Sequence, residues 1–378
     1  MSGIACQRHR FAIPDEVHYL NCAYMGPLSH DVNAAMMQGA QGKQTPWNFR
    51  PQDFFTVSEK FRERAARIAG VEADSIAIVP SVSYALAVAA RNLPVGRGQQ
   101  IVTLADQFPS NVYVWRELAA REGGEIVAVQ RDEQTCWTAA VLDVIGPDTA
   151  IVAVPNCHWA DGRVVDLEQV GAKCRQHGAA LVLDLTQSLG AMPLDFDAVQ
   201  PDFAVAACYK WLLGPYGIGM FYVAPRHHGG EPIEHNWINR SGSQDFARLV
   251  DYRDDYQPGA RRFDMGEKSN PPLLNGAGAA IDFLLEFGVA AIGKGLASQT
   301  AAIAREAQDI GLTAAPQATR APHFLSLGFP EGVPERLTES LAKRHVHVSL
   351  RGASLRVTPH LYNNARDHAA LIETLQEA

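Results

Sequence analysis

The sequence lacks long apolar runs, basic blocks, internal repeats and low-complexity linkers. No uncharged apolar run approaches the ~20 residues that a helix needs to cross a bilayer, and the opening residues MSGIACQRHRFAIPDE contain no apolar segment typical of a secretory signal. The 33 Lys and Arg residues against 41 Asp and Glu residues give a formal net charge of −8. We therefore expect a protein that binds neither membranes nor nucleic acid.

Cysteine is sparse and scattered. The six cysteines form no CxxC pair and stand at Cys6, Cys22, Cys136, Cys157, Cys174 and Cys208. This spacing argues against a disulfide framework and against a zinc site, so no metal site is expected. It is typical of reduced thiols, which predicts a cytoplasmic protein.

Short apolar runs alternate with helical periodicity through the first half of the chain. Strands are expected at 76–79, 100–104, 126–129, 150–154, 180–183, 203–207 and 219–223. Helices are expected between several of them, at 84–92, 112–121, 138–145 and 167–177. Because strands that alternate with helices build parallel sheets covered on both faces, the pattern predicts a three-layer α/β domain with a mostly parallel sheet.

The pattern changes after Pro225. Residues 226–262 are rich in Gly, His, Asp and aromatic residues, as irregular structure around an active site often is. Alanine-rich helices are expected at 274–286 and 293–308. The remaining runs predict a small α+β domain, with elements at 323–327, 337–343, 346–350, 355–357 and 367–376.

Two of the expected strands end on side chains that carry chemistry. Asp184 follows the run 180–183, and Tyr209 and Lys210 follow the run 203–208. Parallel strands end together at the carboxyl edge, where open α/β folds bind ligands, so these side chains should share one crevice. A lysine can hold pyridoxal 5'-phosphate (PLP) as a Schiff base, and a carboxylate at the pyridine nitrogen keeps the ring an electron sink. The alternative is that Asp184 caps a helix or forms an ion pair, and that Lys210 lies on the surface.

The expected strand 76–79 runs directly into a helix through Pro80, Ser81, Val82 and Ser83. The free N–H groups at a helix start suit a phosphate, and the two serines would add hydroxyl donors. A plain helix cap made by Ser81 or Ser83 explains the same residues equally well.

The motif DLTQS, followed by the Tyr209-Lys210 pair and the glycines after it, resembles the class V aminotransferase family. Its members include cysteine desulfurases, kynureninases and isopenicillin N epimerase. The likeness runs from Tyr19 to Asn363. It implies a fold-type-I PLP-dependent transferase, with a large PLP-binding domain at 20–265 and a small domain at 1–19 and 266–378. It also implies a homodimer with shared active sites.

By this resemblance, the phosphate of PLP is held by the main chain of Val82, the hydroxyl of Ser83 and the phenol of Tyr209. Val82 replaces the small residue usual in the family. A further contact is expected from the partner subunit, made by Ser269 or Lys268, because relatives carry a Gly-Thr motif in that stretch.

The resemblance also assigns residues to the cofactor ring. Lys210 would form the Schiff base and Asp184 would face the pyridine nitrogen. Phe108 would stack on the ring, since kynureninases carry a Phe-Pro pair where this chain has Phe108-Pro109. Gln187 would hydrogen-bond the ring hydroxyl or the Schiff-base region. Trp159 stands at the position where relatives carry a polar or aromatic residue that contacts the oxygen side of the ring.

Arg356 would bind the α-carboxylate of an amino-acid substrate, because a guanidinium binds carboxylates in a bidentate way. Asn21 is expected to line the same pocket, and weaker candidates are His360, Tyr24 and Trp237. Cysteine desulfurases carry a loop with a catalytic cysteine between their equivalents of Arg351-Gly352 and Arg356. This chain joins these residues directly and has no cysteine after Cys208, so desulfurase activity is disfavoured. Kynureninase is disfavoured because Gln187 replaces the usual histidine.

The resemblance implies a reaction on a small amino acid through an external aldimine and removal of the Cα proton by the freed Lys210. We predict transamination. The motifs also admit β-elimination by a C–S lyase, racemisation or epimerisation, and a non-catalytic PLP-binding protein, because the fold does not choose among them.

Overall fold

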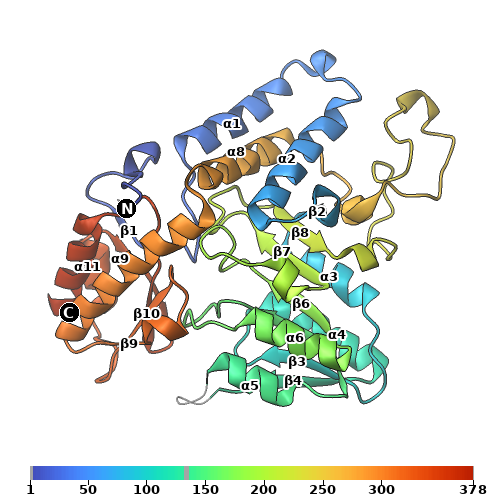
Figure 1. Ribbon diagram of the computed structural model, residues 1–378. Coiled ribbons are helices and arrows are strands. Elements are labelled where there is room, and N and C mark those ends of the chain that lie inside the picture. Colours follow the sequence, from blue (N-terminus) through green and yellow to red (C-terminus); the bar gives the residue numbers. More distant parts are fainter. Residues whose placement is uncertain (1–2, 132–135, 378) are drawn as a thin grey trace.

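A seven-stranded sheet lies at the centre of the computed structural model, which describes residues 3–131 and 136–377 (Figure 1). Its strand order is β2-β8-β7-β6-β5-β3-β4. The strands are β2 (Ile76–Val79), β3 (Gln100–Leu104), β4 (Glu125–Val129), β5 (Thr149–Pro155), β6 (Ala180–Asp184), β7 (Phe203–Ala207) and β8 (Gly219–Val223). β8 runs antiparallel to both of its neighbours, and the other four pairs are parallel. The predicted mostly parallel sheet is confirmed.

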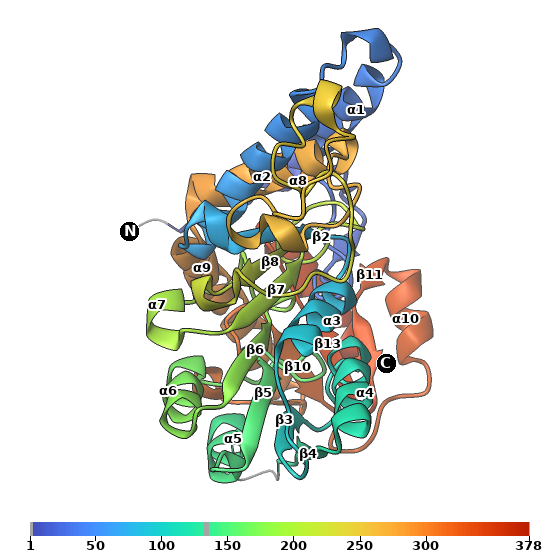
Figure 2. The same ribbon diagram turned by 90° about the vertical axis from the view of Figure 1, so that its right-hand side faces the viewer.

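Helices cover both faces of this sheet (Figure 2). One face carries α5 (Trp137–Val144), α6 (Leu167–His177) and α7 (Phe196–Val199), and the other carries α3 (Val82–Asn92) and α4 (Tyr113–Glu122). Side chains along a strand point to alternate faces. In β6, Leu181 and Leu183 therefore join one apolar core, whereas Val182 joins the other. Both faces are buried, which explains the near-continuous apolar runs of the sequence and confirms the predicted three-layer arrangement.

Three further helices pack together beside β2. They are α1 (His30–Gly42), α2 (Asp53–Ala69) and α8 (Pro271–Phe287). α9 (Val289–Asp309) follows α8 after a bend of 76°. No described helix is by itself long and apolar enough to cross a membrane, and only α8 and α9 taken together reach that length and composition.

The C-terminal part contains a second, antiparallel sheet of order β12-β13-β10-β9. Its strands are β9 (Thr313–Ala314), β10 (Leu325–Gly328), β12 (Ser349–Arg351) and β13 (Ser354–Val357). Leu325, Leu355 and Leu371 belong to the core that this sheet forms with α9, α10 (Leu337–Lys343) and α11 (Ala365–Glu377). These elements are the α+β unit that the sequence predicted.

The N-terminal segment lies against this C-terminal part. β1 (His18–Tyr19) pairs in parallel with β11 (Val346–His347), and Asn21 forms a bridge with Thr358. The division into a large domain (20–265) and a small domain (1–19 and 266–378) stays a prediction.

Several element boundaries differ from those expected. α3 begins at Val82 rather than at residue 84, because the hydroxyl of Ser81 caps the helix at that point. The expected strand 346–350 is two strands, since β11 pairs with β1 and β12 pairs with β13. α8 begins at Pro271, three residues earlier than expected, because the side chain of Asn270 caps it.

Candidate active site

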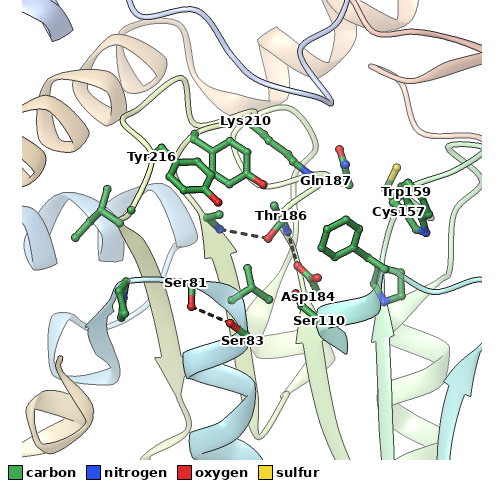
Figure 3. Close-up of a pocket in the computed structure, with 18 of the residues that line it drawn as sticks. Ser81, Ser83, Ser110, Cys157, Trp159, Asp184, Thr186, Gln187, Lys210 and Tyr216 are labelled. Carbon is green, nitrogen blue, oxygen red and sulfur yellow. Dashed lines mark hydrogen bonds between the residues drawn. The ribbon is translucent and has the colours of Figure 1, made fainter. Parts of the chain in front are cut away.

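The carboxyl ends of β6 and β7 meet at one cavity of about 250 Å³ (Figure 3). The two strands are parallel neighbours, with Asp184 opposite Val205. Asp184 ends β6, and Tyr209 and Lys210 follow β7. Nine of the predicted site residues line this cavity, namely Ser81, Val82, Ser83, Phe108, Trp159, Asp184, Gln187, Tyr209 and Lys210. The structure therefore brings them together, while their roles stay predictions.

Asp184 is a buried carboxylate at the base of the cavity, with 9% of its surface exposed. Its Oδ1 accepts a hydrogen bond of 3.0 Å from the main-chain N–H of Thr186, whose own hydroxyl accepts from the N–H of Ala207. Burial raises the pKa of Asp184. No Lys, Arg or His of the described residues forms an ion pair with it. A buried carboxylate without a cation suits a protonated pyridine nitrogen, as PLP provides.

Lys210 enters the cavity from the turn after β7. Only 7% of its surface is exposed, and its Nζ lies 5.4 Å from the centre of the Phe108 ring. Burial lowers the pKa of Lys210 to about 8, and the nearby charge of Asp184 partly opposes that shift. A lysine with a lowered pKa is a nucleophilic amine near neutral pH, as covalent attachment of PLP requires.

The N-terminal segment holds the main chain of this turn. The N–H of Gly26 donates to the oxygen of Tyr209 over 2.8 Å, and the thiol of Cys22 donates to the oxygen of Lys210 over 3.7 Å. Burial raises the pKa of the Cys22 thiol, which therefore stays protonated. These contacts fix the position of Lys210 from a segment almost two hundred residues away in the sequence.

The start of α3 forms the opposite wall. The hydroxyl of Ser81 accepts from the N–H of Tyr84 over 3.2 Å, so the capping alternative is realised for Ser81. The hydroxyl of Ser83 lies 3.0 Å from that of Ser81 and lines the cavity (Figure 3). Burial raises the pKa of Tyr209 to about 12, so its phenol is a hydrogen-bond donor at neutral pH. A helix start with hydroxyl donors suits the phosphate of PLP.

Phe108 and Trp159 form the aromatic side of the cavity. Their ring centres are 5.5 Å apart at an angle of 81°. The indole N–H of Trp159 donates to the main-chain oxygen of Asp106 over 2.6 Å, which fixes the ring.

Gln187 is held on two sides. Its Nε2 donates to the oxygen of Ala23 over 3.2 Å, and its Oε1 accepts from the indole of Trp211 over 3.0 Å. One amide hydrogen of Gln187 remains for a ligand.

Arg356 comes from the C-terminal sheet and does not itself line the cavity, but it contacts Trp159, which does. Its guanidinium donates from Nη1 to the main-chain oxygen of Trp159 over 2.8 Å, and 2% of its surface is exposed. Its Nε is buried without a hydrogen-bond partner, and no carboxylate of residues 3–131 or 136–377 pairs with it. Burial lowers the pKa of Arg356 to about 10. A buried arginine without an acid is suited to the carboxylate of a ligand.

Besides Arg356, two predicted residues lie outside this cavity. Asn21 is buried, and its Oδ1 accepts from the hydroxyl of Ser349, beside the C-terminal sheet. Ser269 donates to the oxygen of Phe54 and lines a different cavity, between α1 and the start of α8. The predicted contact of Ser269 with a partner subunit's phosphate stays a prediction. Lys268, its alternative, is buried and paired with Asp264 over 2.8 Å.

The three weaker candidates are dispersed. His360 is buried against Trp211, and burial lowers its pKa to about 3, so it stays neutral. Tyr24 is exposed, and Trp237 packs on Phe54. None of the three lines the cavity that holds Lys210.

The cavity also includes residues that the sequence did not single out. They include Gln107, Ser110, Cys157, Thr186 and Tyr216. Four of them follow strand ends, as Gln107 and Ser110 do after β3, Cys157 after β5 and Thr186 after β6. Position after a strand end was therefore the signal that could have identified them. Burial raises the pKa of the Cys157 thiol, so it is not a thiolate at neutral pH.

Comparisons with known structures agree with the fold. A cysteine desulfurase from Thermococcus onnurineus NA1 superposes with a TM-score of 0.86 at 20% identity, covering 100% of this chain and 99% of that chain. The cystine C–S lyase C-DES, in complex with cysteine persulfide, superposes with a TM-score of 0.86 at 19% identity, covering 96% of this chain and 98% of that chain. At these identities the likeness shows the fold alone, and it confirms the predicted fold-type-I transferase architecture.

Sequence comparison extends to the family. The chain is 27% identical to the uncharacterized aminotransferase YcbU of Bacillus subtilis over 340 residues, covering 88% of this chain and 86% of that protein. It is 28% identical to a kynureninase of Deinococcus radiodurans over 278 residues, covering 70% of this chain and 64% of the enzyme. A family model described as "Aminotransferase class-V" matches residues 48–362. The chain therefore belongs to the class-V aminotransferase family, whose cofactor is PLP.

Proposed function

We propose that the protein transfers the amino group of a small amino acid to a keto acid in a PLP-dependent reaction. The observation that carries the proposal is the buried, acid-free guanidinium of Arg356, which is hydrogen-bonded to Trp159, a residue that lines the cavity holding Lys210. A carboxylate bound there would present the neighbouring amino group and Cα to the lysine.

Each residue of the site would have a separate role in this reaction. Lys210 would hold PLP covalently, Asp184 would bind its pyridine nitrogen, and Ser83 and Tyr209 would bind its phosphate. When bound, PLP supplies a carbonyl that condenses with amines and a ring that withdraws electrons from the substrate Cα. Nζ of Lys210, with a pKa of about 8, would accept the Cα proton as general base. Arg356 would fix the substrate carboxylate and so the direction of the Cα–H bond.

The hairpin that carries Arg356 argues against cysteine desulfuration. β12 and β13 are joined by the two residues Gly352 and Ala353, with Arg351 paired to Ser354. This tight turn leaves no room for a loop with a catalytic cysteine. The thiols of Cys22 and Cys157, which interact electrostatically with Lys210, and that of Cys208, two residues before it, all have pKa values raised by burial. A sulfur acceptor needs a thiolate.

The test is an assay of the PLP-loaded protein with single amino acids, with and without a keto-acid acceptor. Amino transfer requires the acceptor and yields a new amino acid without ammonia. Release of pyruvate and ammonia without an acceptor from a β-substituted substrate would establish the C–S lyase instead. Inversion at Cα without other products would indicate an epimerase or racemase. Retention of PLP with no turnover of any amino acid would favour a non-catalytic PLP-binding protein.

We also propose a homodimer in which Ser269 contacts the phosphate held by the partner. Its support is the place of Ser269, at the start of α8 in a cavity apart from Lys210 of the same chain. Sedimentation analysis would test the dimer, and Ser269→Ala should weaken PLP retention without altering the molecular mass in solution.

A further inference from the structure

Arg351 is a second arginine on the hairpin that carries Arg356. In an antiparallel pair, residues opposite each other point to the same face. Ser349 is opposite Arg356, and Arg351 is opposite Ser354. Arg351 and Arg356 therefore share one face, as diagonal neighbours with Cβ atoms about 7 Å apart.

That face is turned toward the cavity that holds Lys210. Arg356 reaches from it to the main-chain oxygen of Trp159, which lines the cavity. The opposite face carries Leu355, in the core with α9 and α11. Arg351 stands at the tip of the hairpin, next to the turn at Gly352, and is exposed.

Arg351 has no acidic partner in the described part of the chain. Its Nη1 donates to the main-chain oxygen of Leu350 over 2.7 Å, and no ion pair involves it. Its charge lowers the pKa of both Arg356 and Lys210, so it lies within electrostatic reach of each. Three cationic groups, Arg351, Arg356 and Lys210, thus lie within electrostatic reach of one another, and the carboxylate that acts on Lys210 is Asp184, at the base of the cavity. Like charges repel at short range, and a ligand with two negative groups would relieve that repulsion.

We propose that Arg351 binds a second anionic group on the substrate, so that the enzyme favours amino acids whose side chain carries a carboxylate, sulfinate or phosphate. The inference rests on the proposed function, because it takes Arg356 as the site of the α-carboxylate. Arg351 then sets the preference for an acidic over a neutral side chain.

The first test measures binding without turnover. The PLP-loaded protein is titrated by calorimetry with succinate and glutarate, and with butyrate and valerate, which match them in chain length and lack one carboxylate. We expect the dicarboxylates to bind about tenfold more tightly, the difference that one partly exposed charged contact provides. Arg351→Gln should abolish this difference and leave monocarboxylate affinity unchanged. Arg336→Gln, at an exposed position on the far side of the small sheet at the start of α10, is the matched control and should retain it.

The second test compares substrates. Aspartate, glutamate, cysteine sulfinate and phosphoserine should exceed asparagine and glutamine in kcat/KM, and Arg351→Gln should remove the advantage through KM. The strongest of the four identifies the anionic group.

The outcomes separate the two proposals. Equal binding of mono- and dicarboxylates by the wild type would overturn the role of Arg351 alone. The same conclusion would follow if Arg336→Gln lost the preference for dicarboxylates as fully as Arg351→Gln. If Arg356→Gln leaves the binding of every carboxylate unchanged, the proposed function itself fails.

Discussion

Arg356 and Trp159 are joined by a hydrogen bond of 2.8 Å from Nη1 of the arginine to the main-chain oxygen of the tryptophan. The bond connects the C-terminal sheet to the loop after β5, at the edge of the cavity that holds Lys210. The guanidinium carbon also lies 5.8 Å from the ring centre of Trp159 and 5.9 Å from that of Phe324. Arg356 is thus held in place before any ligand arrives, with its Nε free.

Replacement of Arg356 by lysine should weaken amino-acid binding by about 10- to 100-fold, because a lysine keeps the charge but loses the two-point contact with a carboxylate. Equilibrium titration with amino acids measures the effect. The PLP content of Arg356→Lys should equal that of the wild type, since Arg356 does not line the wall assigned to the cofactor. Arg336→Lys is the control for an exposed arginine. Wild-type affinity in Arg356→Lys would remove the arginine from the substrate site.

The attachment of PLP to the apo protein should depend on pH with a midpoint near 8. Only the neutral amine of Lys210 is nucleophilic, and its pKa is about 8 because the side chain is buried. The rate of attachment, followed by absorbance, should therefore rise up to about pH 9 and then level off. With a lysine of ordinary pKa, the rate would continue to rise toward pH 10. Asp184→Asn should shift the midpoint to lower pH, because the carboxylate raises the pKa of Lys210. A rate that still climbs at pH 10 would contradict the burial of Lys210.

Gly26→Ala should disturb the turn that carries Lys210. A methyl group at Gly26 would collide with the main-chain oxygen of Lys210 and with the side chain of Leu213. Overpacking of this kind lowers the free energy of unfolding by about 1–3 kcal/mol, which urea denaturation measures, and it should reduce PLP retention.

Gly295→Ala is the matched control for Gly26→Ala. Gly295 lies within α9 with open space around the position of a Cβ. Alanine there should raise stability by about 0.5–1 kcal/mol. Equal stability of Gly26→Ala and the wild type would show that the main chain around Gly26 shifts to accommodate the methyl group at little cost in free energy.

The protein should lose stability in mild acid because of two buried histidines. Burial lowers the pKa of His323 to about 4 and that of His360 to about 3. Below about pH 6.5 the unfolded chain binds protons at these two histidines, whereas the folded chain does not. The free energy of unfolding is therefore highest above pH 6.5 and decreases as the pH falls toward 4. Each contributes a decline of about 1.4 kcal/mol per pH unit in that window.

Urea denaturation between pH 4.5 and 8 measures this decline. His323→Gln and His360→Gln should each have a shallower slope than the wild type, whatever their stability at pH 8. His9→Gln, at an exposed position, should have the wild-type slope. An unchanged slope in both buried variants would assign the acid sensitivity to other groups.

The sequence determined the central sheet and the presence of Asp184 and Lys210 in one cavity. Both follow from local rules, because buried parallel strands appear as apolar runs and end at a common edge. The sequence also predicted that a helix starts after β2, but it did not decide whether the serines there cap the helix or bind a phosphate. Ser81 caps the helix, whereas the hydroxyl of Ser83 contacts that of Ser81 and not the helix main chain, and only the packed structure distinguishes the two serines.

The tertiary structure alone decided what surrounds Lys210. Gly26 and Cys22 hold its turn, Trp211 orients Gln187, and Arg356 meets Trp159 from a different sheet. These contacts join residues far apart in the chain, and no local pattern of polar and apolar residues records them. They arise because close packing of the N-terminal segment and the C-terminal sheet against the cavity admits one arrangement of buried side chains. The charge of Arg351 beside Arg356 likewise emerges from strand register and not from spacing in the sequence.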